Sequence, residues 1–227
     1  MSNIVSKNKT QWVSPLKRIG YTAPIKTVKM QQTNTLLPEL QQHLQRLWES
    51  FNTGIRSIKA VKPKQYLEDK GLDYQQLNIG FCSGQFHHRK DDAWRQPYIE
   101  LGILTPSDAP VNHVDRKAYT CFGTYSVVFP LKDVAGKIVN LFAIRIKMAS
   151  APEEYLNNLG IYPCYPPPLT RRLYITSTIM DAASIIQANV LDSREAVIAL
   201  HDGKWLPQHN SIIQDLEMLE EVIIVKN

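Results

Sequence analysis

The sequence lacks long hydrophobic runs and has few cysteines. No apolar stretch among its 227 residues approaches the roughly 18 residues that a membrane-spanning helix needs, and the N-terminus has no apolar core typical of a signal peptide. The only cysteines are Cys82, Cys121 and Cys164, an odd number at distant positions. The few, distant cysteines predict a reducing, cytoplasmic setting without a disulfide framework. The lack of a long apolar run predicts that a membrane is not a partner.

Acidic residues are missing from the first 38 positions. That segment carries six basic residues, whereas the remaining 189 residues hold 20 basic and 21 acidic side chains, so the net charge of +5 belongs to the N-terminal part. It is rich in Ser, Asn, Gln, Thr and Lys without a sustained period, which predicts a disordered basic tail over residues 1–35. Such a tail either solubilises the chain or lies along a phosphate backbone.

Two helices are predicted early in the chain. Over residues 34–51, Leu37, Leu40, Leu44, Leu47 and Phe51 recur at steps of three and four, which places them on one helix face. A second helix is expected from Pro63 to Gly71, where glycine suits a C-cap. A short helix and then extended segments are expected over 72–88, and a surface loop over 105–118.

The middle of the chain predicts a hairpin. Strands at 124–131 and 137–147 flank a turn that contains Gly136. Residues 148–154 are interpreted as a connector, and the proline-rich stretch 162–172 as an irregular loop.

From residue 173 onward, apolar strands alternate with helices. Strands at 173–176, 196–200 and 221–225 are separated by helices at 179–189 and 207–219, an order that predicts a parallel sheet with crossover helices. Functional residues in such sheets lie beyond the carboxyl ends of the strands, here at Ser177, His201–Asp202 and Asn227. The predicted fold class is therefore α+β with α/β: a helical and mixed-sheet N-terminal subdomain over 36–150, then a small parallel β-α-β-α-β unit over 151–227.

Four segments in this order resemble the catalytic core of bacterial DnaG-type primases. They are "YLEDKGLDYQQLNIGF" at 66–81, "VVFPLKDVAGKIVNLF" at 127–142, "YLNNLG" at 155–160 and "LYITSTIMDAASIIQA" at 173–188. The first pieces are similar to the family's N-terminal subdomain, and the last is similar to the start of its toprim domain. The order and spacing of the four pieces carry the resemblance, which extends over roughly residues 45–227.

The resemblance implies a metal-dependent chemistry for which this sequence lacks the expected residues. Toprim enzymes place a glutamate after the first strand and two aspartates after the third, and these hold Mg²⁺ or Mn²⁺ during nucleotidyl transfer. Here Ser177 stands at the glutamate position and Asn227 at the first aspartate position, and the second aspartate has no counterpart. The chain is therefore expected to be catalytically impaired, with no confidently assigned cofactor.

Asp181 and Asp202 are weak substitutes for the missing carboxylates. Each also has a structural interpretation, because Asp181 falls in the first turn of a predicted helix and Asp202 in an "HDG" turn.

Nucleic-acid binding does not need those carboxylates. The resemblance implies a basic groove for single-stranded DNA or RNA, where cations contact phosphates and aromatic rings stack on bases. Each side chain also has an ordinary interpretation as a packing or solvated residue. The basic candidates are Arg89, Lys90, Arg95, Arg116, Lys117, Arg145, Lys147, Arg171 and Arg172, and the aromatic ones are Phe86, Trp94, Tyr119 and Tyr125.

Other constellations fit known chemistry less well. Cys82, His87 and His88 match no zinc-ligand spacing and lack an evident fourth ligand, and the zinc ribbon that DnaG-type primases carry has no counterpart. Ser177, His201 and Asp202 invite a hydrolase triad, but no G-x-S-x-G elbow surrounds the serine. Cys121 and Cys164 show no nucleophile context.

Three hypotheses follow. The chain is a degenerate primase-like protein that binds nucleic acid or a replication partner such as a helicase. Alternatively, it is a genuine primase whose remaining acidic residues lie on sequence absent from this chain, which ends on an apolar strand. In the third, it is a protein-interaction scaffold, for example of a mobile element. Metal-dependent primer synthesis separates the second from the others, and salt-dependent single-strand binding separates the first from the third.

Overall fold

The computed structural model describes residues 36–107, 118–146 and 153–225. The predicted basic tail over residues 1–35 lies outside these ranges. No helix within them has the length and apolar character required to cross a membrane.

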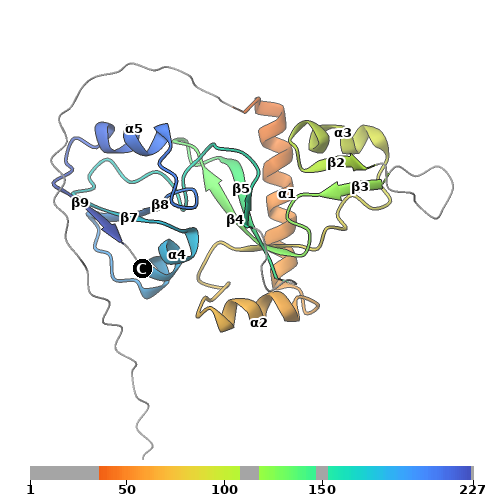
Figure 1. Ribbon diagram of the computed structural model, residues 1–227, viewed down its shortest axis with the longest axis horizontal. Coiled ribbons are helices and arrows are strands. Elements are labelled where there is room, and N and C mark those ends of the chain that lie inside the picture. Colours follow the sequence, from red (N-terminus) through yellow and green to blue (C-terminus); the bar gives the residue numbers. More distant parts are fainter. Residues whose placement is uncertain (1–35, 108–117, 147–152, 226–227) are drawn as a thin grey trace, which may run out of the picture.

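A long amphipathic helix runs through the middle of the molecule. Helix α1 (Pro38–Arg56) has proline at its first turn and buries the apolar face that the sequence predicts, although it continues five residues past Phe51. It packs between the first sheet on one side and α3 (Asp92–Glu100) on the other (Figure 1). Its approach to strand β1 (Gly80–Cys82) is close, since a Cβ atom at Gly80 would lie 2.9 Å from the side chains of Phe51 and Trp48.

The first sheet is antiparallel and deeply buried. Its strand order is β1-β4-β5-β6, with β4 (Ser126–Lys132), β5 (Ile138–Arg145) and β6 (Glu153–Tyr155). The predicted β4–β5 hairpin is confirmed, and the Asp133 carboxylate closes its turn by accepting from the backbone N–H groups of Ala135 and Lys137. Apolar residues cover both faces of β4 and β5, because α1 packs on one side and the parallel unit on the other.

Several local predictions between residues 61 and 121 were wrong. Helix α2 (Val61–Asp69) starts near Pro63 as predicted, but its C-cap is Lys70 and not Gly71, and residues 74–78 form turns where a short helix was expected. Helix α3, whose N-cap Asp91 accepts from the Trp94 N–H, was not predicted, because Pro97 obscures its pattern. The predicted loop at 105–118 contributes to an antiparallel pair, β2 (Leu104–Ser107) with β3 (Ala118–Cys121).

The C-terminal unit has the predicted alternation. Strands β7 (Arg172–Thr176), β8 (Glu195–Ala199) and β9 (Glu221–Val225) form a parallel sheet in the order β8-β7-β9. Helices α4 (Ile179–Ala188) and α5 (Pro207–Asp215) connect them, and α5 is shorter than predicted. The left-handed conformation of Asn189 (φ 49°) ends α4, a position where asparagine substitutes for glycine.

The two units share one hydrophobic core. Phe129 and Phe142 of the antiparallel sheet belong to the same buried cluster as Ile179, Ala182 and Val197 of the parallel unit. Backbone hydrogen bonds also join the sheets, because the segment at Ile161–Tyr162 bridges Lys132 of β4 on one side and Ala199 of β8 on the other. The predicted fold class is thus confirmed, with the two units packed side by side.

Candidate nucleic-acid interface

An open groove of about 1150 Å³ lies where α1 ends, between β1 with its following turn and β3. The two cationic side chains in its wall are Lys59 and Arg145, and none of the described residues that line it is Asp or Glu. Its wall also carries four large aromatic rings at its surface: Phe81, Phe86, Tyr119 and Tyr125. The groove therefore combines positive charge with flat apolar surfaces.

Arg145 and Lys59 have no acidic partner within the described residues. Arg145 ends β5 opposite Ser126, half-buried, and its Nε atom is buried without a hydrogen-bond partner. Lys59 stands exposed in the turn after α1. A buried donor without a partner costs free energy, and an anion in the groove would remove that cost.

The aromatic rings are held in place by their neighbours. Phe81 and Tyr125 meet edge to face with ring centroids 5.6 Å apart, and Phe86 packs on Phe51 at 5.9 Å. Tyr125 adopts a left-handed backbone conformation with φ 58°, which is uncommon for a bulky residue and recurs at functional sites. Fixed rings lose little entropy when a base stacks on them.

A histidine and a further arginine border the groove. His87 lines it with a side chain that is only 7% exposed, and burial, followed by the charges of His88 and Arg95, lowers its pKa, so the ring is neutral near pH 7. Arg95 pairs with Asp92 at 2.8 Å and lies over the Tyr119 ring at 5.2 Å.

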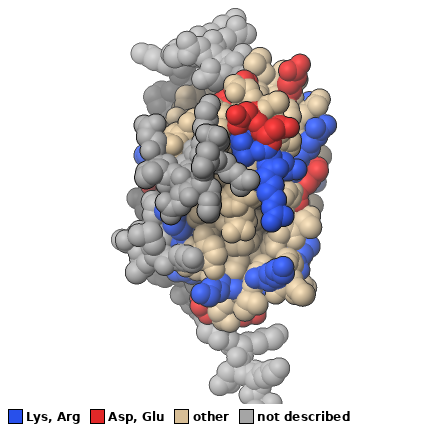
Figure 2. Space-filling view, turned by 90° about the vertical axis from the view of Figure 1, so that its right-hand side faces the viewer, with Lys and Arg blue, Asp and Glu red and all other residues tan. Residues whose placement is uncertain are grey.

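The structure gathers only part of the predicted set. Arg145, Phe86, Tyr119 and Tyr125 line the groove, and the segment with Arg89, Lys90, Trp94 and Arg95 flanks it. Trp94 packs on Tyr98 at 4.5 Å and carries Lys90 over its ring at 5.1 Å. Figure 2 shows the face that bears α3 and the β2–β3 pair, where Lys and Arg groups lie above and below a largely uncharged area and Asp and Glu groups gather toward the top. Arg116, Lys117 and Lys147 lie outside the described residues.

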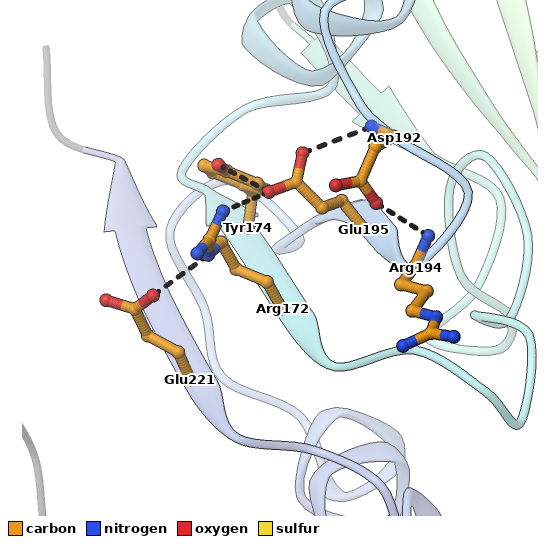
Figure 3. A network of polar contacts seen from close by, with 6 residues as sticks. All are labelled: Arg172, Tyr174, Asp192, Arg194, Glu195 and Glu221. Atoms are coloured by element: carbon orange, nitrogen blue, oxygen red, sulfur yellow. Dashed lines mark hydrogen bonds and ion pairs between the residues drawn. The ribbon is translucent and has the colours of Figure 1, made fainter.

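Arg171 and Arg172 do not belong to this groove, which corrects the predicted grouping. They lie at the amino ends of the parallel strands, where Arg172 bonds Glu195 and Glu221 (Figure 3). Arg171 pairs with Glu220 at 2.8 Å. These carboxylates neutralise both guanidinium groups. The pair of adjacent arginines in the sequence does not reveal the acids that the ends of β8 and β9 bring beside them.

The carboxyl ends of the parallel strands bring Ser177 beside the His201–Asp202 turn. Ser177 follows β7, and its carbonyl accepts from the Gly203 N–H at 2.9 Å. Asp202 follows β8, exposed and with φ 50°. Asn227 lies outside the described residues.

His201 is a packing residue at this edge. It is 3% exposed and stacks on Tyr155 with centroids 4.5 Å apart and ring planes 9° from parallel, while its Nε2 lies 3.3 Å from the Gly160 carbonyl. Burial lowers the pKa of His201 to about 4. Within the described residues no hydrogen bond joins His201 to Ser177, so the hydrolase triad is not assembled.

The acids near this edge do not form a dication site. Asp181 accepts from the Thr178 hydroxyl at 2.7 Å, and its own N–H donates back to that hydroxyl, which is a helix cap on α4. Asp202 faces Glu153 of β6, whose pKa is raised by burial and then by the Asp202 charge. In the parts of the chain that the structure describes, no three or more His, Cys, Asp or Glu side chains are arranged to hold a metal. The described donors thus do not fit Mg²⁺ or Mn²⁺, which require several carboxylate oxygens.

The cysteines and histidines that were considered as zinc ligands are also not grouped among the described residues. Cys82 and Cys121 are buried and both thiols point at the Phe122 carbonyl, at 3.7 and 3.2 Å. They are not gathered with His87 and His88 into a metal-binding group within the described residues.

Three residues of these sites were missed from the sequence. Lys59 and Phe81 line the groove, and Glu153 faces Asp202. Lys59 had a usable signal, because residues 50–67 contain four cations and no acid. Glu153 had none, since its approach to Asp202 depends on how β6 packs beside the parallel sheet.

Comparison with known proteins places this arrangement in a structural context. Neither models of protein families nor curated protein sequences gave a match. Among solved structures, a DnaG primase catalytic domain bound to single-stranded DNA is similar, with a TM-score of 0.65 and 17% identity over 82% of this chain and 60% of that one. The E. coli primase catalytic core gives a TM-score of 0.61 and 17% identity, over 82% of this chain and 61% of that one.

A third similar structure is the RNA polymerase domain of Mycobacterium tuberculosis primase DnaG in complex with a double-stranded DNA oligomer with a 6-nucleotide overhang. It gives a TM-score of 0.65 at 12% identity, over 83% of this chain and 64% of that one. The predicted resemblance to the primase catalytic core is confirmed as a likeness of fold. This chain spans about 60% of the length of the first of these structures.

Proposed function

We propose that this primase-like chain binds single-stranded nucleic acid in the groove and is impaired in metal-dependent nucleotidyl transfer. The observation that carries the proposal is the groove itself: Lys59 and Arg145 without acidic partners, four aromatic rings, and no carboxylate among its described lining residues. The matched structures bound to single-stranded and double-stranded DNA support the choice of ligand. A replication setting in the cytoplasm, with a helicase or mobile element as context, belongs to the same proposal.

The groove suits single strands because it offers two kinds of contact. Lys59 and Arg145 pair with backbone phosphates, and each such contact makes binding weaker as salt rises. Tyr119 and Tyr125 present ring surface to unpaired bases, and stacking tolerates any base. A duplex hides its base faces, so it satisfies only the phosphate contacts.

The impairment rests on the donor chemistry at the carboxyl edge of the parallel sheet. A serine hydroxyl at position 177 is neutral and supplies none of the charge that attracts a dication. Asp181 is already engaged with Thr178, so Asp202 alone would remain as an available carboxylate on these strand ends. Binding is therefore expected to be independent of Mg²⁺.

The test is fluorescence anisotropy of labelled single-stranded DNA across a salt series, with and without Mg²⁺. We compare the wild type with the double variant Lys59→Ala/Arg145→Ala, and use Arg171→Ala/Arg194→Ala as the control with equal charge loss at the amino ends of the strands. The groove variant is expected to bind at least about tenfold more weakly at low salt, with a log–log salt slope shallower by ~1.4 for two lost phosphate contacts. The control keeps the wild-type affinity within about twofold.

Other results lead to other conclusions. If both variants weaken binding equally, net charge and not the groove determines affinity, and the proposed site is wrong. Binding or primer synthesis that requires Mg²⁺ would support the genuine-primase alternative. Absence of binding at low salt would leave the protein-interaction scaffold.

A further inference from the structure

The corner between α1 and α2 joins strong positive charge to exposed apolar side chains. Residues 50–67 hold four cations and no acid: Arg56, Lys59, Lys62 and Lys64. From the same corner Ile58 projects with 90% of its side chain exposed, and Val61 with 66%. Ile58 and Val61 lie three positions apart on the same corner, so their exposed apolar groups are available to a ligand there.

The corner is a fixed turn. The Ser57 N–H donates to the Gly54 carbonyl at 3.2 Å, and the Ala60 N–H donates to the Ser57 carbonyl at 3.1 Å. The Lys64 ammonium donates to that same carbonyl at 3.0 Å. Ile55 and Ala60 are buried on either side, so Ile58 is held outward between two anchored positions.

The corner continues directly from the groove. Ser57, Lys59 and Ala60 line the groove wall, and Ile58 stands between them in the chain. Lys59 and Lys62 are exposed, and neither forms an ion pair within the described residues. A strand that extends from the groove along this part of its wall would pass Ile58 and these cations.

We propose that this corner binds the junction where a single strand becomes a duplex, with Ile58 packing against the terminal base pair and Lys59 and Lys62 contacting the phosphates there. The proposal rests on single-strand binding in the groove. A terminal base pair presents an apolar face, and aliphatic side chains pack against bases at exposed steps in other nucleic-acid complexes. The second strand also adds phosphates, which the cation excess of the corner complements. An anionic membrane would also complement the cations and the exposed apolar side chains of the corner. The corner is continuous with the groove wall, however, and this favours nucleic acid as the ligand.

The experiment compares two labelled ligands by fluorescence anisotropy at one salt concentration. One is a single strand, and the other is the same strand annealed over half its length to a complementary oligonucleotide. The wild type is expected to bind the junction about fivefold more tightly than the single strand, and Ile58→Ser is expected to remove this preference while leaving single-strand affinity unchanged. The control is Val134→Ser, which alters a side chain that is 82% exposed in the turn at the opposite end of the β4–β5 hairpin. It is expected to keep the preference.

The outcomes separate this inference from the proposed function. No binding of either ligand overturns single-strand binding itself. Equal wild-type affinity for both ligands, or a preference that survives Ile58→Ser, overturns the junction proposal alone. Ile58-dependent binding to phosphatidylserine vesicles, with no junction preference, would assign the corner to a lipid surface instead.

Discussion

The groove on the antiparallel unit and the carboxyl edge of the parallel sheet differ in how their charges are balanced. In the groove, Lys59 and Arg145 face open space without acidic partners among the described residues. At the carboxyl edge, His201 is neutral and stacked, and Asp181 is engaged in a helix cap. The groove keeps its polar groups available to a ligand, whereas the edge uses most of its own in internal contacts.

The proposed ligand groove and the edge where the resemblance implies metal chemistry are built from separate parts of the fold. The cations and rings of the groove come from β1, β3, β5 and the turns after α1, β1 and β3, and none of them follows a parallel strand. A change of side chains at the carboxyl edge therefore does not alter the residues that line the groove. The proposed single-strand binding does not depend on the carboxylates that the resemblance implies at that edge.

The largest effect is expected at the contact between the two regions. The Tyr155 ring lies between those of Phe142 and His201, with centroid distances of 4.6 Å and 4.5 Å. Tyr155→Ala therefore removes a ring from the contact between the antiparallel and the parallel unit. The free energy of unfolding is expected to fall by about 3 kcal/mol, measured by urea denaturation. Tyr155→Phe keeps both ring contacts and is expected to cost less than about 1 kcal/mol. Equal losses in the two variants would show that the hydroxyl and not the stack joins the units.

Low pH is expected to lower the free energy of unfolding through His201, which lies at the same contact between the units. The folded-state pKa of His201 is about 4, below its ordinary value of 6.5, so the unfolded chain binds more protons between these values and stability falls as pH drops. His201 alone is expected to lower the free energy of unfolding by about 2 kcal/mol between pH 7.5 and pH 5. Burial also lowers the pKa of His209 and His87, which acts in the same direction.

Urea denaturation at the two pH values measures this loss, and His201→Phe serves as the comparison because it keeps a ring against Tyr155 without a titrating group. The variant is expected to show a smaller pH dependence than the wild type. An identical pH dependence in both proteins would mean that other groups are responsible.

The smallest effect is expected at Ser177. If the carboxyl edge plays no part in binding, Ser177→Ala changes single-strand affinity by less than about twofold, with or without Mg²⁺, because its carbonyl and not its hydroxyl makes the contact with Gly203. Anisotropy titrations in both buffers measure it. A Mg²⁺ dependence that is present in the wild type and absent in the variant would contradict the separation of the two regions.

The sequence alone determined the elements with strong local patterns. The apolar spacing of α1, the hairpin about Gly136 and the alternation from residue 173 all predicted the observed elements, because backbone periodicity dictates which side chains share a face. That Ser177, after β7, stands at the glutamate position of the primase core follows only from the resemblance and stays a prediction. Helix α3 was missed because Pro97 interrupts its pattern.

Only the tertiary structure decided which distant residues meet. Lys59 and Arg145 are 86 positions apart in the sequence, yet they line one groove because α1 packs beside the sheet that contains β5. Arg171 and Arg172 appear in the sequence as a basic pair, but the order β8-β7-β9 brings Glu195 and Glu221 to either side of Arg172. Local pattern determines secondary structure, whereas the balance of charge at a site depends on strand order and packing, which no short stretch of sequence encodes.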